Sequence, residues 1–237
     1  QYFSDLVRIA GLAHGTDVWL GNAQTLIKEG KATISTAICT RDDIMIYLIQ
    51  KGLDSEESFK IMEMVRKGKV ASGKCKEWPE WKQDMIDHGV PDWYIWSCER
   101  IKYMFPKAHA AAYVMMAWRV AYCKVFYPLA YYTAYFSIRA TAFDYEKMAM
   151  SPVRLEHYIA EYKAKKAEGT ISNTEEDELG VMRIVQEMHA RGYEFTPIDI
   201  YKAKARTFQI IDGKIMPSFK VISKVGEVAG ESIEIAA

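Results

Sequence analysis

The stretch between residues 102 and 113 constrains the fold and chemistry of this chain more than any other. It places Lys102, Lys107 and His109 around Pro106, and a long run rich in alanine and aromatic residues follows. Proline resists the interior of a helix but is tolerated where a helix begins. We therefore expect a helix to start near residue 108 or 109.

The apolar run over residues 110–138 resembles a membrane segment at first sight. It is interrupted by Arg119, Lys124 and Pro128, and no uncharged part reaches the roughly 20 residues that a membrane helix needs. We expect two buried helices over residues 110–127 and 129–139, and no membrane partner. No signal peptide is visible. Because the chain begins with Gln1 instead of methionine and ends abruptly in a helix-like run, we also expect a fragment of a larger protein.

The start of the first apolar helix suits a phosphate. Unpaired N–H groups, the helix dipole and Lys107 would all attract an anion. His109 and Tyr113 are four residues apart and share a face of that helix. A nucleoside triphosphate could use this arrangement of donor and ring, although an ordinary helix start with two solvated lysines has the same pattern.

The overall composition sets limits on partners and compartment. The 31 basic and 31 acidic residues balance, so nucleic-acid affinity must come from local basic clusters. The four cysteines are widely spaced and lack the spacing of a zinc site, which predicts reduced thiols in the cytoplasm. We expect no metal site in this chain.

The periodicity predicts a mainly α fold. No strand pattern competes with helices over residues 1–140, where we expect helices at 3–12, 22–28, 41–50, 54–66, 81–88 and 91–103. Two charged amphipathic helices follow between residues 152 and 191. Residues 207–215 predict a small hairpin, and a helical pattern returns from residue 219.

Two other groups of charged residues are candidates for binding a phosphate or another anion. Arg66, Lys67 and Lys69 form a basic helix end, which either complements the helix dipole or clamps a phosphate. Arg41 is a candidate anion contact or a member of a surface ion pair. It precedes Asp42-Asp43, but neighbouring helix positions diverge by about 100°, so these aspartates should cap a helix and not share a metal.

The sequence of the tail over residues 222–233 is close to the pattern of the turn and second helix of a helix-hairpin-helix. The glycine turn of that motif offers backbone N–H groups to a DNA phosphate. Here Gly226 fits the pattern, whereas Lys224 stands where the motif usually has its first glycine.

With these residues laid out, the chain resembles the PolC-type alpha subunits of bacterial DNA polymerase III, in the C family of replicative polymerases. The resemblance covers essentially the whole chain, and a few strings carry it most clearly: residues 3–9, 11–23, 41–45, 65–69 and 101–113. It implies polymerase fingers at residues 1–145, a helical connector at 146–205 and the start of a helix-hairpin-helix region at 206–237.

The resemblance also implies roles. Lys107 and His109 would face the triphosphate of an incoming deoxynucleotide, Phe105 and Tyr113 would lie near the nascent base pair, and Lys224 and Gly226 would contact DNA. Further triphosphate candidates are Arg66, Lys67, Lys69, Lys102 and Arg41. The carboxylates that hold Mg²⁺ belong to a palm domain outside this chain, so we expect no catalytic residue here and an inactive fragment.

The expected partners are primer–template DNA, deoxynucleoside triphosphates and, in the full protein, a sliding clamp and other replisome subunits. The expected location is the cytoplasm, in a nucleoid-associated replisome. A helical DNA-binding or protein-interaction module without a part in catalysis is the alternative. It would bind DNA in a salt-dependent way without any nucleotide effect.

Overall fold

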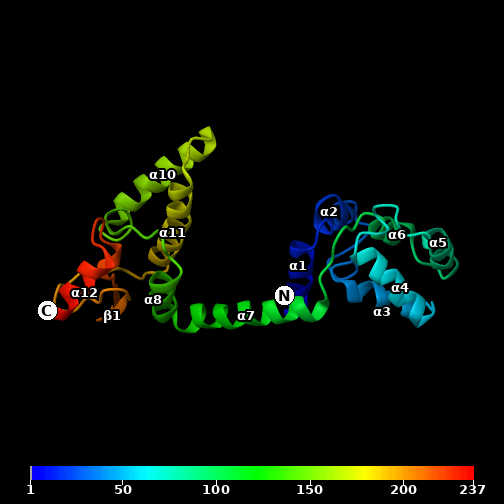
Figure 1. The fold of residues 1–237 in the computed structure, drawn as a ribbon, viewed down its shortest axis with the longest axis horizontal. Coiled ribbons are helices and arrows are strands. Elements are labelled where there is room, and N and C mark those ends of the chain that lie inside the picture. The colour runs from blue at the N-terminus through cyan, green and yellow to red at the C-terminus, as the bar shows by residue number, and fades with distance from the viewer. Residues whose placement is uncertain (1) are drawn as a thin grey trace. The chain divides into compact units, whose positions relative to one another are not determined.

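The structure is a computed structural model that describes residues 2–237 (Figure 1). It is mainly α, as predicted, with one two-stranded sheet. The chain divides into two compact units, and the boundary along the sequence lies between Trp118 and Arg119. Among the described residues, no helix is both long and apolar enough to cross a membrane.

The first unit is built around one helical core. Buried side chains from successive helices meet there, including Ile44 and Leu48, Ile61 and Met85. Its elements are α1 (Phe3–His14), the π-turn η1 (Trp19–Ala23), α2 (Gln24–Lys28), α3 (Arg41–Gln50), α4 (Ser55–Arg66), α5 (Trp78–Asp87), α6 (Asp92–Cys98) and the beginning of α7 (Lys107–Phe126). Figure 1 shows α3 and α4 as direct neighbours, which positions the site described below.

Local sequence signals determine where α3 and α4 begin. Thr40 and Asp43 form a capping box, in which the Thr40 N–H donates to Asp43 Oδ2 at 2.8 Å. Asp54 caps α4 by accepting from the N–H groups of Glu56 and Glu57. Both starts agree with the sequence prediction, because an acidic side chain at a helix N-terminus satisfies amides that have no partner within the helix.

Two predicted boundaries in this unit are wrong. Helix α5 begins at Trp78 and not at residue 81, with Pro79 in its first turn. Helix α6 ends at Cys98 and not at residue 103. Beyond α6 the chain is extended, because its backbone groups bond to Thr16 and to the end of α4 instead of continuing a helix.

The second unit has a core of its own, with Tyr132, Phe136, Met148 and Leu155 among its buried residues. Its elements are the rest of α7, α8 (Pro128–Ile138), α9 (Tyr145–Met148), α10 (Pro152–Glu168), α11 (Asn173–Ala190), β1 (Gln209–Ile211), β2 (Lys214–Met216), the 3₁₀ turn η2 (Phe219–Val221) and α12 (Glu227–Ala236). The antiparallel hairpin is the predicted one, and it turns at Asp212 and Gly213, both with positive φ.

The compact units divide earlier than the predicted functional boundary at residue 145. The reason is that Tyr132 and Phe136 of α8 pack into the second core. The division into fingers, connector and helix-hairpin-helix region is drawn by function and stays a prediction.

Candidate nucleotide-binding site

The extended segment between α6 and α7 joins the elements that carry the predicted cations. Three backbone hydrogen bonds hold it: from the Thr16 N–H to the Tyr103 carbonyl at 2.9 Å, from the Met104 N–H to the Arg66 carbonyl at 3.2 Å and from the Arg41 N–H to the Phe105 carbonyl at 3.1 Å. The loop after α1, the end of α4 and the start of α3 therefore meet on this one segment.

Gly68 makes the closest of these approaches possible. It has a φ of 67°, and a Cβ added there would lie 2.5 Å from the Lys102 carbonyl oxygen. No other residue tolerates both the left-handed backbone and the contact. The basic end of α4 is thereby pressed against the start of the segment.

At the mouth of α7 the Lys107 N–H is already paired, whereas the Ala108 and His109 N–H groups have no partner among the described residues. The helix begins at Lys107, and the Lys107 N–H donates to Asp42 Oδ2 at 2.6 Å. Asp42 thus caps a helix distant from its own, while Asp43 caps α3. The aspartate pair diverges, as predicted, but the role of Asp42 was not foreseen.

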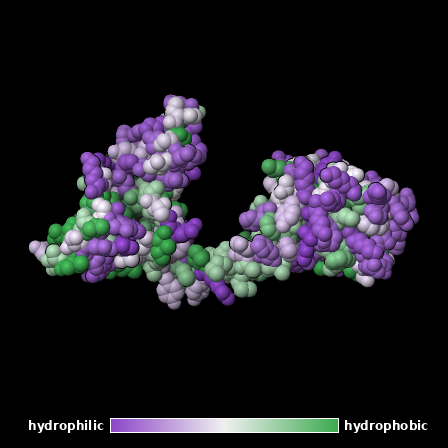
Figure 2. Space-filling view, viewed as in Figure 1, coloured by the Kyte–Doolittle hydropathy of each residue, from purple (hydrophilic) through white to green (hydrophobic). Residues whose placement is uncertain are grey.

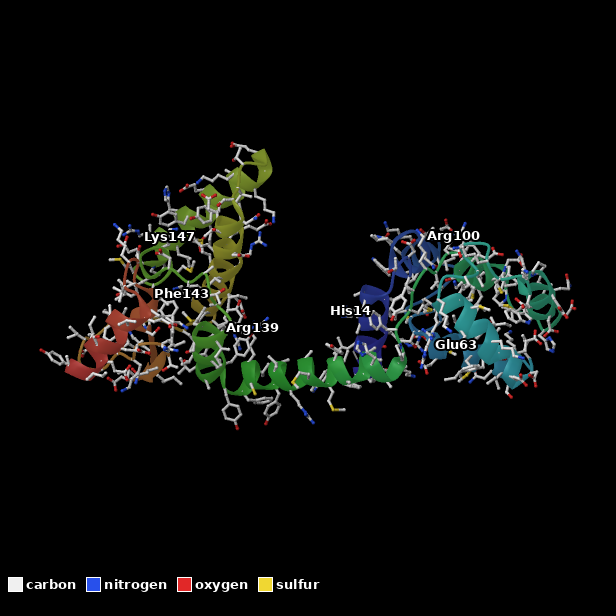
Figure 3. All side chains as sticks on the ribbon, viewed as in Figure 1. His14, Glu63, Arg100, Arg139, Phe143 and Lys147 are labelled. Atoms are coloured by element: carbon white, nitrogen blue, oxygen red, sulfur yellow. The ribbon has the colours of Figure 1, made fainter. Side chains whose placement is uncertain are left out.

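The aromatic residues at the start of α7 pack ring against ring in a row. The Phe105 and His109 rings stack at 4.9 Å with 12° between their planes, and His109 lies 4.6 Å from the ring of Tyr113. The rings of Tyr103 and His14 make T-shaped contacts with Phe105, with centroid distances of 5.2 and 6.1 Å. Figure 3 shows His14 on α1. The predicted common face of His109 and Tyr113 is confirmed, and Tyr113 is 62% exposed.

Three predicted cations converge on a residue that the sequence analysis did not select, Glu63. Figure 3 labels Glu63 on α4. Arg66 holds its carboxylate with two hydrogen bonds, from Nε to Oε1 at 2.5 Å and from Nη2 to Oε2 at 2.8 Å. Lys67 Nζ lies 2.9 Å from Oε2, and Arg41 Nη1 lies 3.6 Å from Oε1. We call these four residues the Glu63 cluster.

The electrostatics of the Glu63 cluster follow from this geometry. The hydrogen bonds from Arg66, more than any other contact, lower the pKa of Glu63 to about 2. Glu63 in turn raises the pKa of Arg66. Glu63 lies three residues before Arg66 and four before Lys67, a spacing that places the three side chains on one helix face. The sequence could therefore have predicted this part of the cluster.

The other predicted cations lie apart from the Glu63 cluster. Lys102 Nζ pairs with Asp17 Oδ2 at 2.7 Å. The exposed side chains of Lys69, Lys107 and His109 have no hydrogen-bond or ion-pair partner within residues 2–237. Lys107 lines a pocket of about 350 Å³ together with Arg8 of α1, a residue that the sequence analysis did not select.

No metal centre is present in the part of the chain that the structure describes. Groups of three or more histidine, cysteine, aspartate or glutamate side chains that could hold an ion are absent from residues 2–237. The three buried cysteines are free thiols, and burial raises the pKa of the Cys39 thiol to about 12, which keeps it protonated.

The tail contains a turn at Lys224, before α12. Lys224 has a φ of 67°, the conformation that glycine favours, and the Val225 N–H donates to the Ile222 carbonyl at 3.1 Å. Helix α12 follows directly, with Gly226 at its N-cap. The DNA contacts of Lys224 and Gly226 stay predictions.

Most of the first unit is similar in sequence to a known class of protein segment. Residues 1–89 match the family described as the bacterial DNA polymerase III alpha subunit finger domain. This range contains Arg41 and the basic end of α4 and stops before Lys102.

Nearly the whole chain is similar to proteins named DNA polymerase III PolC-type. The identity is 50% over 234 residues to the protein of Streptococcus suis, 48% over 234 residues to that of Streptococcus thermophilus and 47% over 231 residues to that of Caldanaerobacter subterraneus. These alignments cover 98 to 99% of this chain but only 16% of each relative. The predicted resemblance to PolC-type polymerases, with fingers at the beginning of the chain, is confirmed.

Proposed function

We propose that this chain is the part of a bacterial replicative DNA polymerase that binds the incoming deoxynucleoside triphosphate and faces the primer–template. The observation that carries the proposal is the convergence of Arg41, Arg66 and Lys67 beside the segment that leads into α7. Positioned cations of this kind neutralise the negative charge of the phosphates during nucleotidyl transfer.

Lys107 and His109 supply further donors in this proposal. Both side chains are exposed and without a polar partner among the described residues, so an anion would not have to displace an existing contact. The rings of Phe105 and Tyr113 flank His109 and present apolar faces on which a base can stack. Lys69 and Lys102 complete the set of triphosphate candidates.

The bond-making step requires groups that these residues do not provide. Mg²⁺ supplies charge stabilisation and activation of the primer hydroxyl in polymerases, and the described residues contain no site that fits it. We propose that palm carboxylates outside this chain hold it. The side chains of this chain bind and orient the nucleotide, in a cytoplasmic replisome with a sliding clamp and other subunits.

The test uses a full-length polymerase that contains this segment. Lys107→Ala and His109→Ala should each raise the apparent KM for deoxynucleotide in primer extension by about tenfold, the effect of losing one charge-assisted hydrogen bond. Lys28→Ala is the matched control, because Lys28 is an exposed lysine of the same unit whose side chain has no hydrogen-bond or ion-pair partner within residues 2–237. Unchanged KM and kcat in both variants would refute the triphosphate contacts.

A second function, DNA binding by the tail, is supported by the turn at Lys224 and the start of α12. Backbone N–H groups at such a turn suit a DNA phosphate. Salt-dependent binding of primer–template that weakens on Lys224→Glu would support it. If deoxynucleotide has no effect on any property of the segment, the alternative of a non-catalytic DNA-binding module is favoured.

A further inference from the structure

The carboxylate of Glu63 is shared by three cations that approach from different directions. Oε1 faces Arg66 and Arg41, and Oε2 faces Arg66 and Lys67. The Glu63 side chain is 18% exposed, so solvent screens these contacts less than it would at an open surface. Arg41 comes from α3 and the other two cations from the end of α4. Glu63 therefore links the two helices through its ion pairs with three cations.

Glu63 does not use all the donors that surround it. Arg66 binds it through Nε and Nη2 and keeps Nη1 without a hydrogen bond among the described residues. Arg41 approaches Glu63 only through Nη1, at 3.6 Å, and its side chain makes no hydrogen bond among the described residues. A guanidinium group carries five N–H donors in a fixed plane, so an anchor on one edge determines where the remaining donors point. Three cations and one carboxylate leave the cluster positively charged.

The side of the cluster toward α5 is unsuited to an anion. Glu63 and Lys67 line a groove of about 750 Å³ there. Its other charged residues are mostly acidic: Asp54, Glu56, Glu57, Lys60 and Glu77. Figure 2 shows the visible face of this unit as largely hydrophilic. An anion would therefore approach the cluster from the segment that carries Phe105, where the Arg41 backbone is already attached.

We propose that Glu63 is a positioning residue for the triphosphate site: it holds Arg41, Arg66 and Lys67 together so that their remaining donors meet the phosphates. This inference rests on the proposed nucleotide binding. Glu63 itself does not touch the nucleotide. Its negative charge would by simple Coulomb repulsion weaken triphosphate binding, so a positioning role and a purely electrostatic role predict opposite effects when that charge is removed.

The experiment measures primer extension by the full-length polymerase at varied deoxynucleotide concentration. Glu63→Gln, which keeps the length of the side chain and removes its charge, should raise the KM for deoxynucleotide about tenfold, with a much smaller change in the KM for primer–template. Glu63→Asp, which keeps the charge on a shorter arm, should give an intermediate KM. Glu56→Gln is the matched control: it removes the same charge from the same helix, at a side chain that is 76% exposed and pairs with Lys60.

Arg66→Ala and Arg41→Ala, measured in parallel, separate the possible outcomes. If both leave the KM for deoxynucleotide unchanged, the proposed triphosphate site itself is wrong. If they raise it while Glu63→Gln leaves it unchanged or lowers it, the triphosphate site stands and the positioning role of Glu63 is overturned. Should Glu63→Gln not fold, Glu63→Asp decides: a raised KM supports the role, and an unchanged KM overturns it.

Discussion

Replacing Gly68 by alanine tests the contact that presses the basic end of α4 against the segment leading into α7. The added methyl group would lie 2.5 Å from the Lys102 carbonyl oxygen and 3.0 Å from the Lys102 Cα. Both are backbone atoms, and they are held by the hydrogen bonds of Lys102 and Tyr103 to Thr16. They cannot swing aside as a side chain would, so α4 and the segment must separate.

The loss of unfolding free energy in Gly68→Ala has two parts. A residue other than glycine in the left-handed conformation costs about 1–2 kcal/mol, and forcing an extra methyl group into a packed site costs about 1–3 kcal/mol more. Gly73 isolates the first part, because it has the same φ of 67° and nothing within 4 Å of an added Cβ. Gly68→Ala should therefore destabilise the first unit by about 2–5 kcal/mol, and Gly73→Ala by about 1–2 kcal/mol.

Tryptophan fluorescence provides a selective assay. All six tryptophans lie at or before Trp118, so their emission during urea unfolding follows the first unit alone. Equal losses of unfolding free energy in Gly68→Ala and Gly73→Ala would show that the close approach to Lys102 contributes nothing. The same Gly68 variant should raise the KM for deoxynucleotide, since it displaces the Arg66 carbonyl from the Met104 N–H.

Two further predictions concern Glu63 and Lys224. The pKa of Glu63 is lowered from 4.5 to about 2 in the folded chain, so its stabilising effect is complete above about pH 4.5 and is lost as the pH falls toward 2. Between these values the unfolding free energy of the first unit should fall by about 1–3 kcal/mol more than in Glu63→Gln, as followed by tryptophan fluorescence. Lys224→Gly should stabilise the second unit by about 0.5–1 kcal/mol in thermal unfolding followed by far-UV circular dichroism, because it removes the cost of a positive φ.

Each of these predictions has a result that contradicts it. Identical pH profiles for the original chain and Glu63→Gln would mean that the carboxylate gains nothing from its cations on folding. Ser223→Gly serves as the control for Lys224, because Ser223 is a neighbour without a positive φ. If Ser223→Gly stabilised the second unit as much as Lys224→Gly, the argument from backbone conformation would fail.

Much of the local structure was predictable from the sequence. The acidic caps at Asp43 and Asp54 marked the starts of α3 and α4, and the Asp212-Gly213 turn marked the hairpin. These features depend on residues a few positions apart, and the physics of capping and turns acts over that distance. The end of α6 was mispredicted because partners far along the chain, such as Thr16, decide it.

The candidate site also has features that the sequence predicted and features that depend on tertiary packing. The sequence by itself determined which side chains carry charge and rings, and that His109 and Tyr113 share a helical face. Only the tertiary structure decided that Arg41 meets Glu63, because this requires α3 to pack on α4. It also decided that Asp42 accepts from the Lys107 N–H at the start of α7, across 65 residues of chain. Ion pairs and caps between distant residues form only where packing of the core has already placed them, and no local pattern encodes that placement.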